Sequence, residues 1–166
     1  MKIPPLKLNS DLLIKKNHLL LIIFFSFCLI TCNKTTDNTM VKDNNSLVIK
    51  SGFMCGWGAG QDSLIISSTM IKYVYSVPAN SQIPEINKAR PITDTEWNNI
   101  LNSINLNNFL NLKYNSCNIC VDGCDEWIAI KNDAISHQIR FGMGIKIDSI
   151  KPLQDILSQL RSEFRN

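Results

Sequence analysis

The sequence lacks an excess of charge in the part of the chain that is expected to fold. Four of its 17 Lys and Arg and one of its 14 Asp and Glu lie in residues 1–31, so residues 32–166 carry 13 of each sign. Proteins that bind polyanions usually concentrate positive charge in the binding domain. Because its charges balance, this part of the chain gives no general electrostatic reason to expect nucleic-acid binding.

The sequence also lacks the residue patterns of common catalytic sites. It has no Gly-x-Ser-x-Gly segment and no Gly-x-Gly-x-x-Gly turn leading into a helix, so neither a serine-hydrolase elbow nor a dinucleotide fingerprint is present. His137 is the only histidine after residue 31, and it alternates in phase with Ile135, Ile139 and Phe141. We expect it to be packed with one hydrogen bond. We assign no catalytic residue, no metal ligand and no cofactor.

Long hydrophobic runs are missing too. The longest apolar run, residues 19–30, has twelve positions, far fewer than the roughly 20 that a helix needs to cross a bilayer. Lys15 and Lys16 precede it and a polar segment follows it. A basic region before a short apolar core predicts a secretory signal peptide over residues 1–31.

The apolar run ends in Leu29, Ile30, Thr31 and Cys32. This segment resembles the lipobox of bacterial lipoproteins, although Thr31 stands where Gly, Ala or Ser is usual, which leaves ordinary secretion as an alternative. The resemblance implies that the Cys32 thiol receives a diacylglyceryl group, that a signal peptidase cuts before Cys32, and that the new amino terminus is acylated. Lipid on Cys32 would make a membrane the partner, in the bacterial cell envelope and by default on the outer membrane facing the periplasm.

Residues 32–46 are predicted to form a lipid-anchored flexible tether, because they are too polar to bury much surface. Residues 47–166 are predicted to form a single α+β domain. Alternating apolar residues predict strands near residues 47–49, 62–68, 70–77, 126–131 and 135–141. A capping box at residues 93–96 and the apolar spacing from Trp97 to Ile104 predict a helix, and a second begins near Asp148 with Pro152 in its first turn.

The resulting order is β-β-β-α-β-β-α. Strands do not alternate with helices, so we expect an antiparallel sheet of four to five strands with two main helices packed on one face.

Four cysteines remain after Cys28 and Cys32: Cys55, Cys117, Cys120 and Cys124. An even number in an exported domain predicts two disulfides, with three pairings open. In each pairing, Cys55 joins one of the three later cysteines. Two alternatives use the same four thiols, a zinc or iron–sulfur site and a redox-active Cys-x-x-Cys at residues 117–120.

A glycine-rich loop is predicted at residues 52–60, where Trp57 is flanked by glycines. Trp is enriched at binding hot spots, so Trp57 is a candidate binding residue, and Trp127 is expected to pack against the same region. Trp97 is expected in the core. The acidic residues Asp122, Asp125 and Glu126 are interpreted as a solvated turn, with a calcium site or a carboxylate pair as the alternatives.

Two segments carry a further resemblance: CGWGAGQDSL at residues 55–64 and CNICVDGCDEW at residues 117–127, with DTEW at residues 94–97 between them. Together they resemble a family of small bacterial lipoproteins of unknown function, which implies a small α+β domain over residues 47–166. The leading hypothesis is a non-enzymatic, disulfide-stabilised binding or structural module. The alternative is a thiol redox or metal-binding protein that uses the four cysteines.

Overall fold

The computed structural model describes residues 46–166 of the chain. The predicted signal peptide, the lipidation site at Cys32 and all of the predicted tether except Ser46 lie outside the described residues. Among the described residues, no helix is both long and apolar enough to span a membrane.

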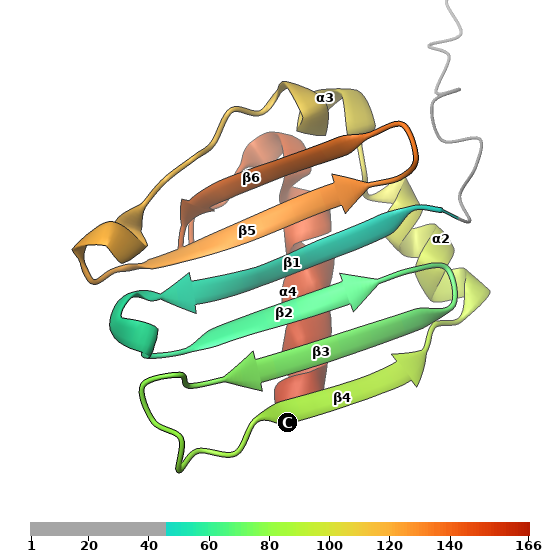
Figure 1. The fold of residues 1–166 in the computed structure, drawn as a ribbon. Helices are drawn as coiled ribbons and strands as arrows, with labels where there is room; N and C mark the ends of the chain where they lie inside the picture. The colour runs from blue at the N-terminus through green and yellow to red at the C-terminus, as the bar shows by residue number, and fades with distance from the viewer. Residues whose placement is uncertain (1–45) are drawn as a thin grey trace, which may run out of the picture. The chain divides into compact units, whose positions relative to one another are not determined.

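The described residues form an antiparallel sheet, which confirms the α+β class, but it has six strands and not the predicted four to five (Figure 1). The strands lie side by side in the order β4-β3-β2-β1-β5-β6. The first three predicted strands and the two later ones are present, and the β2–β3 and β5–β6 hairpins are joined by short turns as expected. The strand bounds are β1 Val48–Cys55, β2 Gln61–Ile66, β3 Met70–Ser76, β4 Ile86–Pro91, β5 Cys124–Lys131 and β6 Ser136–Gly142.

Strand β1 runs further than predicted, and the predicted glycine-rich loop is correspondingly shorter. Gly52 pairs with Ser63 of β2 and Trp127 of β5. A Cβ atom at Gly52 would overlap the backbone carbonyl of Asp62 and lie 3.0 Å from Cζ2 of Trp127. Gly52 is therefore a close-approach position inside a strand and does not break it.

Strand β4 was not predicted, because its sequence does not alternate between apolar and polar residues. It is an edge strand, and its Lys88 and Arg90 reach across to the last turn of the C-terminal helix. Lys88 donates to the carbonyl of Phe164, and Arg90 pairs with both Glu163 and Glu96. Basic residues and Pro91 on an edge protect the sheet from pairing with another chain.

The two predicted helices begin where the sequence indicates, whereas a third, short helix between them was not predicted. Helix α2 spans Asp94–Asn102 and starts with the predicted capping box between Thr93 and Glu96. A second short helix, α3 (Leu106–Asn111), follows it as a separate element. Helix α4 spans Lys151–Arg165 with Pro152 in its first turn, directly after the 3-10 turn η4 (Asp148–Ile150).

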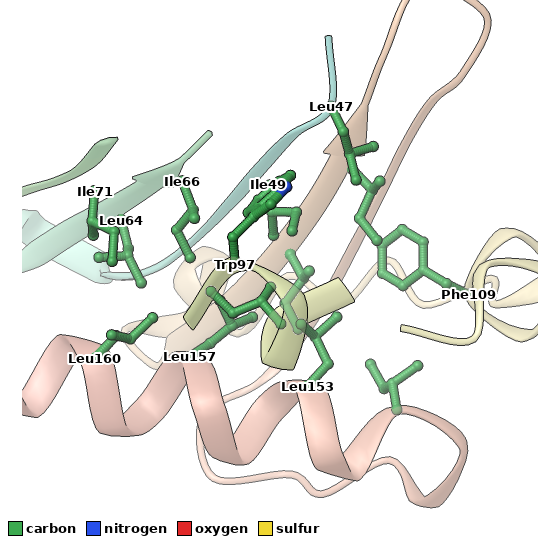
Figure 2. Close-up of a cluster of buried hydrophobic side chains, with 14 of the residues drawn as sticks. Leu47, Ile49, Leu64, Ile66, Ile71, Trp97, Phe109, Leu153, Leu157 and Leu160 are labelled. Atoms are coloured by element: carbon green, nitrogen blue, oxygen red, sulfur yellow. The ribbon is translucent and has the colours of Figure 1, made fainter. Parts of the chain in front are cut away.

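One hydrophobic core lies between the sheet and the helices (Figure 2). Helix α4 crosses one face of the sheet, and Leu153, Leu157 and Leu160 point from it toward the strands. Trp97 of α2 and Phe109 of α3 join the same core near the beginning of β1, so the expectation that Trp97 is buried is confirmed. The other face of the sheet carries no helix of the described chain (Figure 1).

Candidate functional site

Two short loops meet at the end of the sheet where β1 ends and β5 begins. The 3-10 turn η2 (Gly56–Gly58) follows β1, and the 3-10 turn η3 (Asn118–Val121) precedes β5. Because β1 and β5 are antiparallel neighbours, Cys55 lies directly opposite Cys124. The Gly56 amide donates to the carbonyl of Gly123 over 2.9 Å. We call η2, η3 and their flanking residues 55–60 and 117–124 the disulfide end of the sheet.

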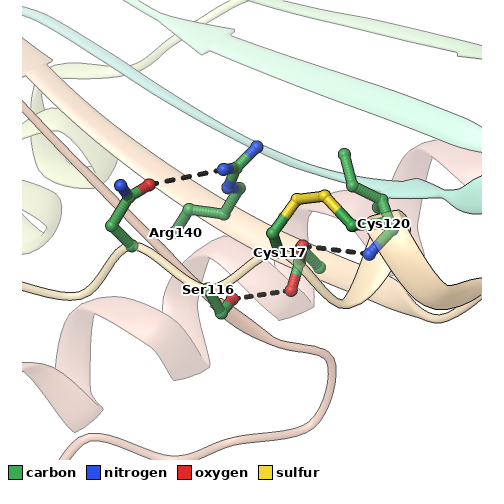
Figure 3. The surroundings of a disulfide bond; sticks show 7 residues. Ser116, Cys117, Cys120 and Arg140 are labelled. Atoms are coloured by element: carbon green, nitrogen blue, oxygen red, sulfur yellow. Dashed lines mark hydrogen bonds between the residues drawn. A yellow bond between two sulfur atoms is a disulfide. The ribbon is translucent and has the colours of Figure 1, made fainter.

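All four cysteines of the described chain form disulfides, which confirms the predicted number of two. Cys55 pairs with Cys124, and Cys117 pairs with Cys120 (Figure 3). The first bridge joins residues 69 positions apart and ties η2 to β5. The second closes a short loop within η3. Among the described residues, no group of three or more metal-ligating side chains comes together.

The disulfide end exposes two large apolar side chains. Trp57 is 84% exposed and Val121 is 78% exposed. Trp57 also has a φ of 54°, in the left-handed region that is unfavourable for a bulky side chain such as tryptophan. Backbone strain at a non-glycine residue persists only where the surrounding structure imposes it, and such residues cluster at binding sites.

A buried carboxylate holds η3 and the residues before it through hydrogen bonds. Asp125 is fully buried, and its side chain accepts hydrogen bonds from the Ser116 hydroxyl at 2.6 Å and from the Ile119 amide at 3.4 Å. On the same side, Arg140 donates to Asn115 (Figure 3). The interpretation of Asp125 as a solvated turn residue was therefore wrong, because the chain folds over it.

A third loop reaches the same end. The Ala79 amide, between β3 and β4, donates to the carbonyl of Gly58 over 3.1 Å. The three loops lie together at one end of the strands in Figure 1, while the start of β1 and helix α2 lie at the opposite end. The loop that contains Ala79 thus adjoins the disulfide end, so three separate parts of the sequence meet there.

Trp127 is placed elsewhere. It is half-buried on the face of the sheet that α4 does not cover, where it lies beside Gly52 of the neighbouring strand. It lines a hollow of about 210 Å³ together with Met54, Ser63 and Val74. Trp57 does not line this hollow, so the two tryptophans belong to different surfaces of the domain.

The acidic residues near Gly123 diverge instead of forming one cluster. Asp122 is exposed in the loop, Asp125 is buried, and Glu126 points to the helix face of the sheet. There the guanidinium of Arg161 lies 3.5 Å from the Glu126 carboxylate and 3.7 Å from that of Asp62. The calcium alternative and the carboxylate pair within this turn therefore receive no geometric support.

The environment of Asp62 was not predicted from the sequence. Asp62 is buried, accepts hydrogen bonds from the Phe53 amide and the Tyr73 hydroxyl, and lies beside Arg161. Burial raises the pKa of Asp62 above its ordinary value, and Arg161 and the two hydrogen bonds partly oppose that rise. A carboxylate in phase with the apolar Leu64 and Ile66 is the sequence signal that could have identified it.

His137 is packed as expected. A ring nitrogen lies 3.0 Å from the carbonyl of Leu112, and the ring meets Phe109 edge to face. The imidazole therefore serves the packing between β6 and α3.

Comparison of the chain with known protein families finds no family that matches, and comparison with curated proteins finds no significant match.

Proposed function

We propose that the protein is a bacterial envelope lipoprotein, held on a membrane through lipid on Cys32, whose domain is a non-enzymatic binding module. The disulfide end of the sheet is its binding surface. The observation that carries the proposal is the display of Trp57: a large aromatic side chain, almost fully exposed, on a strained backbone beside a disulfide. Rigid, exposed aromatic residues are the usual anchors of protein interfaces.

The covalent frame supports this assignment. Covalent bridges on both sides of the Gly56–Gly123 contact hold η2 and η3 in place before any partner arrives. Preorganised loops lose less conformational entropy on binding than free ones. Val121 adds a second exposed apolar contact from η3.

The direction of β1 supports it as well. The chain enters the domain at Leu47, and β1 leads over eight residues to Cys55. At about 3.3 Å per residue, the disulfide end lies roughly 25 Å from the point where the predicted tether joins the domain. A surface at that end is reached without interference from a lipid anchor on Cys32.

The test compares two variants that each remove one exposed apolar side chain. Trp57→Ala alters the disulfide end, and Met70→Ala alters the start of β3 at the opposite end of the sheet. The full lipoprotein is immobilised and used to capture solubilised envelope proteins. We expect specific capture to fall at least about tenfold for Trp57→Ala and to remain for Met70→Ala, as for hot-spot residues.

Three outcomes would contradict the proposal. A loss of capture with both variants would place the interaction elsewhere. A large loss of thermal stability for Trp57→Ala would make Trp57 a packing residue. If the mass of the purified protein shows no lipid on Cys32, the proposed membrane anchor is wrong. The capture experiment then decides the binding surface separately.

A thiol redox role is the second candidate, and one observation favours it. Cys117 and Cys120 are exposed, whereas Cys55 and Cys124 are half-buried. An exposed bridge can be attacked by the thiolate of a dithiol protein, which forms a mixed disulfide and is then released as its own disulfide, leaving two reduced cysteines. Titration in glutathione buffers tests this: reduction of the Cys117–Cys120 bridge near the potential of the glutathione pool supports exchange, and resistance far below it excludes exchange.

A further inference from the structure

The face of the sheet opposite α4 collects positive charge, although the folded domain as a whole is balanced. Lys50 of β1, Lys72 of β3 and Lys131 of β5 are exposed, and each alternates in phase with outward residues of its strand. Arg140 of β6 lies on the same face, opposite Trp127. We call these four residues the basic face.

No exposed acidic residue of the described strands lies on this face. The single carboxylate that the strands place on this face, Asp125, is fully buried and bonded to Ser116 and Ile119. Lys50, Lys72 and Lys131 form none of the ion pairs found among residues 46–166. The balancing carboxylates lie mainly on the helix side, where Glu96, Asp155 and Glu163 are paired with other cations.

The basic face also presents apolar surface. Trp127, Met54 and Val74 are partly exposed there and line the hollow of about 210 Å³. Lys72 and Lys131 are separated by two intervening strands, or roughly 14 Å at the usual strand spacing. The charges are therefore spread across a sheet and do not converge on one point. Such an array complements an extended surface that carries negative charge everywhere better than it complements a single acidic side chain.

We infer that the basic face docks on an anionic phospholipid bilayer, so that the sheet lies on the membrane and the disulfide end stays free at its side. The inference rests on the proposed function in one respect, because lipid on Cys32 would keep the domain near a bilayer. The predicted tether between Cys32 and Leu47 has 14 residues, with an end-to-end distance of about 20 Å if flexible, which lets the sheet reach the surface. Each lysine near an anionic bilayer strengthens the contact roughly fivefold at moderate salt.

The experiment measures how fast individual lysines are acetylated by a water-soluble reagent. The full lipoprotein, with lipid on Cys32 verified by mass, is reconstituted in phosphatidylcholine vesicles with or without about one third phosphatidylglycerol. We expect Lys50, Lys72 and Lys131 to react at least about threefold more slowly on the anionic vesicles, and the difference to vanish in high salt. Lys146 and Lys151, on the α4 side and paired with Asp155, are internal controls whose rates should not depend on the lipid.

A variant keeps the inference falsifiable. In Lys50→Gln/Lys72→Gln, Lys131 remains as the reporter, and its protection on anionic vesicles should be largely lost. The matched variant Lys146→Gln/Lys151→Gln should keep that protection.

Equal rates for Lys50, Lys72 and Lys131 on both kinds of vesicle would overturn the inference and leave the proposed function intact. Protection that needs added envelope proteins would also overturn it, in favour of an acidic protein partner. If Cys32 carries no lipid, the proposed function fails. The same chain is then tested by sedimentation with the vesicles, where binding to neither kind would overturn the inference independently.

Discussion

Cys55 and Cys124 are directly opposite each other at the last pair of the β1–β5 ladder, and their disulfide locks that pair. The bridge joins these neighbouring inner strands at the end where the chain leaves β1 through η2. It lies between residues that are 69 positions apart, and the other bridge spans only three. The two disulfides therefore differ in what they do for the fold.

Removing the two bridges should have unequal effects on stability. In the chain-entropy view, Cys55→Ala/Cys124→Ala costs about 4 kcal/mol, and Cys117→Ala/Cys120→Ala costs about 2 kcal/mol. Urea unfolding of each double variant measures the difference. A larger loss for the 117–120 pair would mean that η3, and not the β1–β5 connection, limits the stability of the domain.

The protein should be less stable with alanine than with glycine at position 57. Both substitutions remove the exposed ring, but only glycine adopts the φ of 54° without strain. We expect Trp57→Gly to be more stable than Trp57→Ala by about 1 kcal/mol, while both lose partner capture. Thermal unfolding of the two variants measures this, and the opposite order would show that residue 57 does not hold a positive φ in the folded protein.

Gly52→Ala should be strongly destabilising. The new methyl group would overlap the carbonyl of Asp62 and press against Trp127, so we expect a loss of about 2–4 kcal/mol. Gly144→Ala is the matched control, because its Cβ would meet no atom within 4 Å and only the φ of 80° is unfavourable. The control should lose about 1 kcal/mol. Similar losses in the two variants would mean that β1 and β2 separate easily at Gly52.

Asp62→Asn should change how stability depends on pH. Because burial raises the pKa of Asp62, its folded form holds the proton more tightly than the unfolded chain does. The contribution of Asp62 to stability is thus full below its ordinary pKa of 3.8 and declines as the pH rises through the folded pKa. The stability of Asp62→Asn relative to the unsubstituted protein should therefore increase from about pH 3 to about pH 7, measured by urea unfolding.

Glu96→Gln gives a control of opposite sign for the same measurement. Hydrogen bonds from Arg90 and Thr93 lower the pKa of Glu96 to about 2, so its contribution is full above its ordinary pKa of 4.5 and is lost as the pH falls through 2. The stability that Glu96→Gln loses relative to the unsubstituted protein should therefore become smaller toward low pH. A pH-independent difference for Asp62→Asn would show that the Arg161 ion pair fully offsets its burial.

Regular elements with a clear local pattern could be predicted from the sequence. The β2–β3 hairpin, the capping box at Thr93 and the start of α4 at Pro152 each depend on residues close together in the chain. Strand β4 was missed because its Lys88 and Arg90 are set by partners more than 70 residues away on α4. The extension of β1 through Gly52 was missed because a glycine reads as a break until its neighbours across the sheet are known.

The candidate site divides in the same way. Trp57 and the four cysteines were identified from their residue types. A tryptophan between glycines and an even number of cysteines in an exported domain are informative without a structure. Three features of the site were not identified from the sequence, because each depends on which strands become neighbours. They are the pairing of the cysteines, the burial of Asp125 under η3 and the separation of Trp127 from Trp57.

By itself, the sequence determined the α+β class, the starts of α2 and α4 and the number of disulfides, since these follow from local patterning and side-chain chemistry. Only the tertiary structure decided which cysteines pair, that η2 and η3 meet through Gly56 and Gly123, and that Lys50, Lys72 and Lys131 share one face. The physical reason is strand order: placing β1 between β2 and β5 brings together residues that are about 70 positions apart, and no local preference specifies that order.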